Sequence, residues 1–299
     1  MTKAIKKTAN IAAIKDVNYE LAHLNISGVT VGNKNAPVVL CLHGWLDNCA
    51  SFLPFFEQMI ATKSPLLDKF QFVAIDFPGH GLSSHRSADS QYHFIDWSYD
   101  VLQLLNVNQW KSVHIIGHSM GGMVATTFTS AFNDRVESLI LVESIGLITD
   151  VDGPSEQIRK GLLSRLAMSA KRVPIHKDID SAIKARMNVS DLNTQSAKLL
   201  VMRNLKQVEG GVTWRSDPRL KNVSAQRFSL KQAEQVVANI HCPVTVVLGD
   251  TGYDMVQSGV KVFSSHINNL QTLSITGGHH PHMESQQQFC QLVEQKYNK

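Results

Sequence analysis

The chain lacks long apolar runs, paired cysteines and an excess of charge of either sign. Its cysteines, Cys41, Cys49, Cys242 and Cys290, include no C-x-x-C pair, so reduced and mostly buried thiols are expected instead of a disulfide framework. No apolar segment approaches the ~20 residues of a membrane span, so no stable membrane insertion is expected. The net charge of +4 is small and dispersed, so no nucleic-acid partner is expected.

The N-terminal stretch contains lysines with no apolar run behind them. A secretory signal needs an apolar stretch of roughly 7–15 residues, so none is expected and the predicted location is cytoplasmic. Hydrophobic residues make up 43% of the 299 residues, which is ordinary for a globular enzyme and too many for disorder. The length suits one large domain with an insert.

What the sequence does contain is a series of short apolar runs that alternate with amphipathic stretches. Buried strands are predicted for the runs at 37–44, 70–76, 111–117, 135–144, 242–249 and 270–276. Helices are predicted at 52–62, 94–105 and 120–132, with a final helix from about Met283. Two short strands, 19–24 and 29–31, are expected before these, joined by a turn around Ser27–Gly28. The alternation predicts an α/β fold with a mostly parallel central sheet flanked by helices.

The pattern changes between 149 and 235, where it is helical with no strand-like run. This segment holds 16 Lys+Arg against 9 Asp+Glu, and the remainder of the chain holds 13 against 16. The predicted organisation is therefore an α/β core at 1–148 and 236–299, interrupted by a basic helical insert at 149–235. We interpret the basic charge as a solvated helical surface in preference to a device that steers anionic substrates.

The strongest local motif is the pentapeptide Gly117-His118-Ser119-Met120-Gly121, which has the form G-x-S-x-G. A buried strand leads into it and a helix leads out, so the serine lies at a sharp strand-to-helix turn. Glycine on each side allows the strained backbone and close strand–helix approach that such a turn requires. The pattern also arises by chance, and it is this context that favours a nucleophile at Ser119 over an inert turn serine.

A serine nucleophile needs N–H donors for the oxyanion that forms when it attacks a carbonyl. Met120 follows the nucleophile at the positive end of the predicted helix, so its backbone N–H is one expected donor. His43-Gly44-Trp45 follows the strand at 37–44 and offers the Trp45 N–H as the second donor of this oxyanion hole. Gly44 ends the strand in either case, and the Trp45 side chain is left free to line a pocket.

The general base is expected near the C-terminus, after the nucleophile and the acid in chain order. Thr276-Gly277-Gly278-His279-His280-Pro281-His282 follows the last strand, and its two glycines let the loop bend over the nucleophile. Spacing alone does not decide which histidine acts. The three histidines also invite a metal site, but no Asp, Cys or further His stands at helical ligand spacing and Pro281 stiffens the stretch. We therefore predict neither a metal nor a cofactor.

The acid that would hold the histidine tautomer can come from two places. Glu143 ends the apolar run 139–142 beside the nucleophile's strand, where a buried glutamate is costly unless it is paired. Asp250 and Asp254 lie in the loop after 242–249, where an Asp is usually a local cap of backbone groups.

Together these residues resemble the α/β-hydrolase superfamily over nearly the whole chain. Besides GHSMGG, its motifs occur in order as LHGWLDN (Leu42–Asn48), DFPGHGLS (Asp76–Ser83) and GHHPHME (Gly278–Glu284). Within the superfamily the chain is most similar to the serine hydrolase-like proteins, partly through SDPRL (Ser216–Leu220). The resemblance implies the α/β-hydrolase fold and identifies the insert as a helical cap over the nucleophile. It places the catalytic histidine at His279, with His280 and His282 as neighbours.

The resemblance also bears on the acid and on the other motif residues. Asp76 and His80 match a turn that is not usually catalytic. In many relatives the acid lies three residues after the glycine that ends the strand following the cap, which is Gly252 here. Some relatives carry it one strand earlier, at the position of Glu143, so Glu143 is favoured over Asp254 and Asp250.

The expected function is therefore a serine hydrolase that forms an acyl-enzyme on Ser119 and acts on small or medium carboxylic esters. The same triad would serve hydrolysis of a carbon–carbon bond, a thioester or a lactone. A weakly active or inactive ligand-binding protein is the rival from another class, supported by Gly252. Serine at 119 excludes dehalogenase and epoxide-hydrolase chemistry, which needs an aspartate there. The expected partner is a small ester-like molecule, and monomer and homodimer both stay open.

Overall fold

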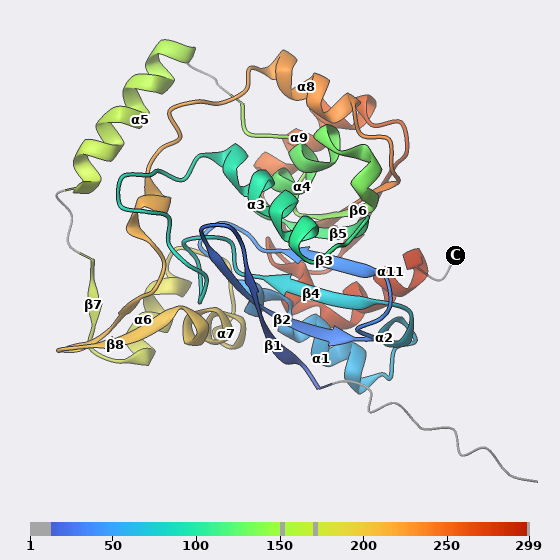
Figure 1. Cartoon of the computed structure of the whole chain (residues 1–299), viewed down its shortest axis with the longest axis horizontal. Coiled ribbons are helices and arrows are strands. Elements are labelled where there is room, and N and C mark those ends of the chain that lie inside the picture. The colour runs from blue at the N-terminus through green and yellow to red at the C-terminus, as the bar shows by residue number, and fades with distance from the viewer. Residues whose placement is uncertain (1–12, 150–152, 170–172, 298–299) are drawn as a thin grey trace, which may run out of the picture.

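The computed structural model describes residues 13–149, 153–169 and 173–297 (Figure 1). The first 12 residues, on which the expectation of no secretory signal partly rests, lie outside the described residues, as do Lys171 and Arg172 of the basic insert. An eight-stranded sheet forms the centre of the molecule. Its strands in spatial order are β1 (Lys15–Glu20), β2 (Asn25–Gly32), β4 (Gln71–Ile75), β3 (Val38–Leu42), β5 (Val113–His118), β6 (Val136–Val142), β10 (Val244–Gly249) and β11 (Leu270–Ile275).

The six strands from β4 to β11 are parallel. At one edge β2 pairs antiparallel with β4, and β1 pairs antiparallel with β2. This confirms the predicted mostly parallel sheet. The register of β3 against β5 runs from Val38↔Val113 to Leu42↔Gly117. The carboxyl ends of these strands therefore lie side by side, and the loop after β3 begins beside the nucleophile motif that follows β5.

Helices cover both faces of the sheet, because residues of the central strands are apolar on both faces. In β3, Leu40 and Leu42 belong to one apolar cluster, and Val39 and Cys41 belong to the other. One face carries α3 (Phe94–Val107), α4 (Met120–Ala131), α8 (Leu230–Ala238) and α9 (Asp254–Phe263) (Figure 1). The opposite face carries α1 (Leu53–Ala61), α2 (Leu66–Lys69) and α11 (Gln286–Tyr297), which follows the short α10 (Pro281–Glu284). Short 3₁₀ helices cover Cys49–Phe52, Asn133–Arg135, Pro218–Lys221 and Ser264–His266.

The predicted turn at Ser27–Gly28 is wrong, because both residues lie inside β2. The connection from β1 to β2 lies at 21–24 instead. A Cβ on Gly28 would lie 2.3 Å from the carbonyl oxygen of Ala74 in β4. Glycine at this position therefore serves close strand approach and not a turn, a distinction that composition does not reveal.

The insert contains α5 (Pro154–Ser169), α6 (Ile179–Met187) and α7 (Thr194–Asn204). It also contains a three-stranded antiparallel sheet in the order β7 (Ile175–His176), β9 (Gly211–Trp214) and β8 (Leu205–Val208), so the expectation of an insert without strands is wrong. These strands are short and partly polar, which leaves no apolar run to detect. The predicted boundary at 235 falls inside α8, which packs against α4 of the core.

The SDPRL segment ties the insert to the core. Asp217 accepts hydrogen bonds from the Tyr92 hydroxyl at 3.0 Å and from Arg219 Nη2 at 2.7 Å. The Trp45 indole N–H donates to the Leu220 carbonyl at 3.0 Å. On the other side of the insert, Arg203 of α7 lies 2.9 Å from buried Asp76. Contacts at both sides therefore hold the insert over the edge of the sheet where β3 and β5 end.

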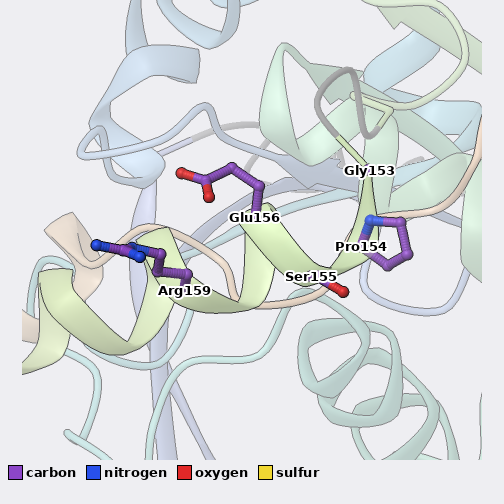
Figure 2. Close-up of a pocket in the computed structure, with 5 residues that line it drawn as sticks. All are labelled: Gly153, Pro154, Ser155, Glu156 and Arg159. Carbon is purple, nitrogen blue, oxygen red and sulfur yellow. The ribbon is translucent and has the colours of Figure 1, made fainter.

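Three of the four cysteines are buried, Cys242 is half-buried, and all four are free thiols, which confirms the prediction of mostly buried thiols. Within the described segments, no helix is long and apolar enough to cross a membrane. A surface hollow lies at the start of α5 and is lined by Gly153, Pro154, Ser155, Glu156 and Arg159 (Figure 2). Its lining holds no histidine or cysteine, so it offers no catalytic pair.

The contact between α4 and the end of β3 gives a test of the packing beneath the site. A Cβ on Gly121 would lie 2.2 Å from the Leu42 carbonyl oxygen, which is backbone and cannot move aside. We expect Gly121→Ala to lower the free energy of unfolding by about 1–3 kcal/mol, the usual range for overpacking. Urea unfolding measures this. Gly259→Ala in α9 is the control and should cost less, because its Cβ would meet nothing nearer than Ile145 Cγ2 at 3.1 Å. Equal losses in the two variants would contradict this explanation.

Candidate active site

Ser119 lies between the end of β5 and the first residue of α4 with φ of 48°, a left-handed conformation that is uncommon outside glycine. A Cβ on Gly117 would lie 2.7 Å from the backbone of Gly121 and Gly122, so strand and helix pack too closely for a side chain here. The Ser119 N–H donates to the Val142 carbonyl of β6 at 2.9 Å. The strained turn is therefore held by the sheet and lifts the serine above its edge.

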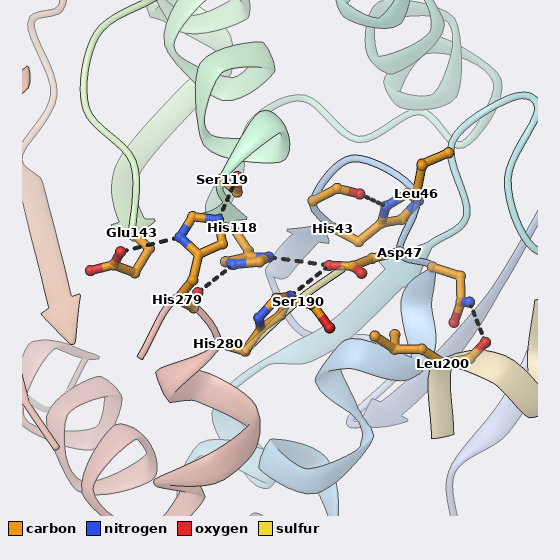
Figure 3. Close-up of polar contacts among 12 residues, drawn as sticks. His43, Leu46, Asp47, His118, Ser119, Glu143, Ser190, Leu200, His279 and His280 are labelled. Atoms are coloured by element: carbon orange, nitrogen blue, oxygen red, sulfur yellow. Dashed lines mark hydrogen bonds and ion pairs between the residues drawn. The ribbon is translucent and has the colours of Figure 1, made fainter. Parts of the chain in front are cut away.

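His279 brings its ring between Ser119 and Glu143 (Figure 3). Its Nε2 lies 2.9 Å from Ser119 Oγ, and its Nδ1 lies 3.2 Å from Glu143 Oε2. Because the carboxylate accepts the Nδ1 proton, Nε2 carries the lone pair that accepts the serine hydroxyl. The Tyr253 ring stacks on the imidazole, with ring centroids 4.0 Å apart and planes 10° apart, and restrains its orientation.

Glu143 is the residue directly after β6, is 1% exposed, and has φ of 48°. Its Oε1 accepts the Gly249 N–H at 2.8 Å, and its Oε2 lies 3.3 Å from the Tyr253 N–H as well as facing His279. N–H donors thus face both oxygens, which suits an ionised carboxylate, an acceptor at each oxygen. The costly burial of this group is offset by three donors from three segments.

The alternative acids lie elsewhere. Asp250 accepts the Gly277 N–H of the loop after β11 at 2.9 Å, a contact across 27 residues and not a local cap, and Asp254 begins α9. Among the described residues, Glu143 is the carboxylate paired with His279. A Cβ on Gly252 would lie 2.3 Å from Glu143 Oε1. A side chain at position 252 would therefore displace the Glu143 carboxylate.

The expected oxyanion donors, the N–H groups of Met120 and Trp45, lie on the segments that follow β5 and β3. Met120 is the first residue of α4, where backbone N–H groups have no intrahelical acceptor. Trp45 is half-exposed and lies in the loop after β3. A Cβ on the preceding Gly44 would lie 2.8 Å from His118 Nδ1, so this loop passes directly beside the residue before Ser119.

A second set of polar groups lies beneath the first and was not predicted (Figure 3). His280 Nε2 lies 3.3 Å from Asp47 Oδ2, and His280 Nδ1 lies 3.1 Å from Asp191 Oδ1. Arg186 Nη2 lies 2.6 Å from the other Asp47 oxygen. Burial lowers the pKa of His280, but the attraction of Asp47 and the bonds to Asp191 and Asp47 outweigh it and raise that pKa to about 9. His280 is therefore an imidazolium at neutral pH.

His118 has the opposite character. Its Nε2 lies 2.8 Å from the His279 carbonyl oxygen, and burial lowers its pKa to about 3, so the ring is neutral and donates from Nε2. Its Nδ1 lone pair faces Asp47 Oδ2 at 3.6 Å. The ligand atoms of Asp47, His118 and His280 lie within 4.8 Å of one another and could hold a metal ion. Arg186 and the His280 proton already balance the two carboxylates of Asp47 and Asp191, so the arrangement does not require one.

No sequence signal pointed to Asp47, Arg186 or Asp191. Asp47 stands two residues after the expected oxyanion donor, and Asp191 comes from the insert, so the fold alone brings them to the histidine loop. Tyr253 was also missed, because an aromatic residue in a turn-like loop is more often a packing residue than a ring support.

The raised pKa of His280 predicts a pH-dependent contribution to stability. An unfolded histidine has a pKa of ~6.5, so protonation of His280 favours the folded state. The contribution is complete below about pH 6.5 and is lost as the pH rises through about 9. Relative to His280→Gln, the wild type should gain up to about 3 kcal/mol in free energy of unfolding at acidic to neutral pH. Urea unfolding from about pH 6 to about pH 10 should show this gap narrow.

Exposed His23 supplies the control for this measurement, because it makes no such buried pair. His23→Gln should change stability little at any pH in the range. A His280→Gln gap that stays constant across the range would contradict the imidazolium assignment.

Comparisons with known proteins identify the family of the chain. The family model for the alpha/beta hydrolase fold matches residues 37–286. The serine hydrolase-like protein of Danio rerio is 31% identical over 281 residues, which cover 90% of this chain and 83% of that protein. Serine hydrolase-like protein 2 of Homo sapiens is 26% identical, with 90% of this chain and 89% of that protein covered.

Solved structures give the same result. The hypothetical protein PA1622 of Pseudomonas aeruginosa PAO1 superposes with a TM-score of 0.87 at 29% identity, covering 95% of this chain and 99% of that one. The family model spans the strand before the Trp45 loop, the Ser119 turn and the His279 loop. The chain therefore belongs to the α/β-hydrolase fold family and, within it, to the serine hydrolase-like proteins.

Proposed function

We propose that this hydrolase cleaves small or medium carboxylic esters through an acyl-enzyme on Ser119. The proposal rests on a continuous line of two hydrogen bonds through the His279 ring. Its Nδ1 lies 3.2 Å from Glu143 Oε2 and its Nε2 lies 2.9 Å from Ser119 Oγ. Such a line is what a general base needs in order to take a proton from a serine hydroxyl and keep its own tautomer.

In the first half of the reaction, His279 Nε2 takes the hydroxyl proton as Ser119 Oγ attacks the ester carbonyl carbon. The carbonyl oxygen becomes an oxyanion, held by the N–H groups of Trp45 and Met120. Glu143 stabilises the imidazolium that forms. His279 then returns the proton to the leaving alkoxide, the carbon–oxygen bond breaks, and an alcohol departs.

The second half repeats this chemistry with water as the nucleophile. His279 takes a proton from water, whose oxygen attacks the acyl carbon, and the same proton goes to Ser119 Oγ as the carboxylic acid leaves. No step needs a metal or a cofactor. The insert between β6 and α8 acts as the cap that covers this chemistry. The half-exposed aromatic rings of Trp45, on the proposed oxyanion loop, and of Tyr253, stacked on His279, suit an apolar part of the substrate.

Ser119→Ala tests the nucleophile. It should reduce turnover of short-chain nitrophenyl esters by about 10⁴-fold or more, because the residue and its base act as a unit. Labelling by a fluorophosphonate probe, read by intact mass, should disappear as well. Ser258→Ala, an exposed serine on α9, is the control and should label like the wild type. Full turnover in Ser119→Ala would show that the reaction occurs elsewhere.

Moving the acid tests Glu143. Glu143→Ala should lower kcat by about 10²–10⁴-fold, because the histidine loses its tautomer support. A Cβ at 252 points into the space of the Glu143 carboxylate, so adding Gly252→Asp to Glu143→Ala should recover at least about tenfold of the loss. Gly252→Asp alone should be defective, because two carboxylates would compete for one space.

Asp254→Ala serves as the control for the acid and should keep wild-type kcat. If Asp254→Ala were as defective as Glu143→Ala, or if Glu143→Ala were fully active, the assignment of the acid would be wrong.

A further inference from the structure

Asp191 lies in the short connection between α6 and α7 of the insert, and its carboxylate bonds the histidine loop in two places. Oδ2 accepts the backbone N–H of His279 at 2.5 Å, across 88 residues of chain. Oδ1 lies 3.1 Å from Nδ1 of His280. One side chain of the insert thus holds the main chain of the candidate base and the ring of its neighbour.

The approach of Asp191 to this loop depends on glycine. A Cβ on Gly278 would lie 2.2 Å from Asp191 Oδ2, so any side chain at 278 would displace the carboxylate. Gly277, with φ of 125°, gives the loop its bend just before. The two glycines therefore do more than bend the loop, because Gly278 also leaves the space through which the insert reaches the His279 N–H.

The contact is one of three ion pairs in series that join the insert to the core. Arg186 of α6 pairs with Asp47, Asp47 pairs with His280, and His280 pairs with Asp191, which follows α6. Asp47 belongs to the loop that carries Trp45, and His280 follows the candidate base directly. The two end residues of this series, Arg186 and Asp191, lie on the insert. The two middle residues lie on core loops that carry residues of the proposed mechanism.

The charges alternate along this series of ion pairs, and its two core residues are buried. Asp47 is 1% exposed and His280 is 4% exposed, whereas the insert supplies a positive partner for one and a negative partner for the other. A buried ion that loses its partner is strongly destabilised. The position of the α6–α7 part of the insert is therefore coupled to the position of the two loops.

We propose that Asp191 is a positioning residue for His279. It fixes the backbone of the base so that the ring, which stacks on Tyr253, directs Nε2 at Ser119. The catalytic pair is then complete only while the α6–α7 part of the insert is docked on the core. This inference rests on the proposed hydrolase mechanism, and it adds to it a residue outside the triad and outside the oxyanion loop.

The test compares Asp191→Ala with Asp191→Asn by ester kcat and KM and by the rate constant for fluorophosphonate labelling of Ser119. Alanine removes the acceptor of the His279 N–H, so kcat and the labelling rate should fall by about 10–100-fold with KM little changed. Asparagine keeps an acceptor oxygen for that N–H, so it should recover most of both rates. A purely structural tether would not separate kcat from KM in this way.

Asp180→Ala, an exposed acidic residue on α6, is the matched control and should behave like the wild type. Wild-type kcat and labelling in Asp191→Ala, or equal losses in the alanine and asparagine variants, would overturn the positioning role. Failure of the hydrolase proposal itself would be visible earlier, as a wild type that neither turns over esters nor labels.

Gly278→Ala provides a second route if Asp191→Ala does not fold. The added methyl should push the carboxylate off the His279 N–H and lower kcat by a similar factor. Because the smaller alanine at 191 makes room for that methyl, Gly278→Ala should cost little further activity in the Asp191→Ala background where that background folds. A fully active Gly278→Ala, or losses that multiply in the double variant, would overturn the proposal.

Discussion

The buried carboxylate of Glu143 is the group on which the rest of the site depends. A carboxylate that is 1% exposed is stable only if N–H donors replace the water it has lost. Gly249 ends β10, Tyr253 lies in the following loop, and His279 follows β11. Satisfying one buried acid therefore brings three strand ends together and orients the base toward the serine.

The fold stores strain at the two residues that follow neighbouring strands. Ser119 after β5 and Glu143 after β6 both have φ of 48°, a conformation that costs about 1–3 kcal/mol for each non-glycine residue. The sheet maintains it, because the Ser119 N–H donates to Val142 and the Glu143 N–H donates to Val247. The insert contacts the same region, since its Arg186 and Asp191 pair with groups on the loops after β3 and β11.

The sequence was informative where a pattern is local. Strands such as 113–118 were predictable because both faces are apolar, and the Ser119 turn because strand, glycines and helix are contiguous. The turn predicted at Gly28 is wrong because the sequence does not distinguish a glycine that permits close strand approach from a glycine in a turn. Asp191 and Asp47 could not be found, because their contacts with the histidine loop span 88 and 233 residues and leave no periodic trace. In the sequence alone Gly252 supports an inactive protein, whereas in the structure the Glu143 carboxylate occupies the space that a side chain at 252 would need.

Ser119 Oγ is proposed to react while His279 stays paired with Glu143. A crystal structure of the protein phosphonylated by a fluorophosphonate tests this most directly. We expect phosphorus bonded to Ser119 Oγ, a phosphoryl oxygen facing the N–H groups of Trp45 and Met120, and His279 Nδ1 still paired with Glu143. An adduct on another residue, or an adduct on Ser119 with His279 paired to a different carboxylate, would contradict it.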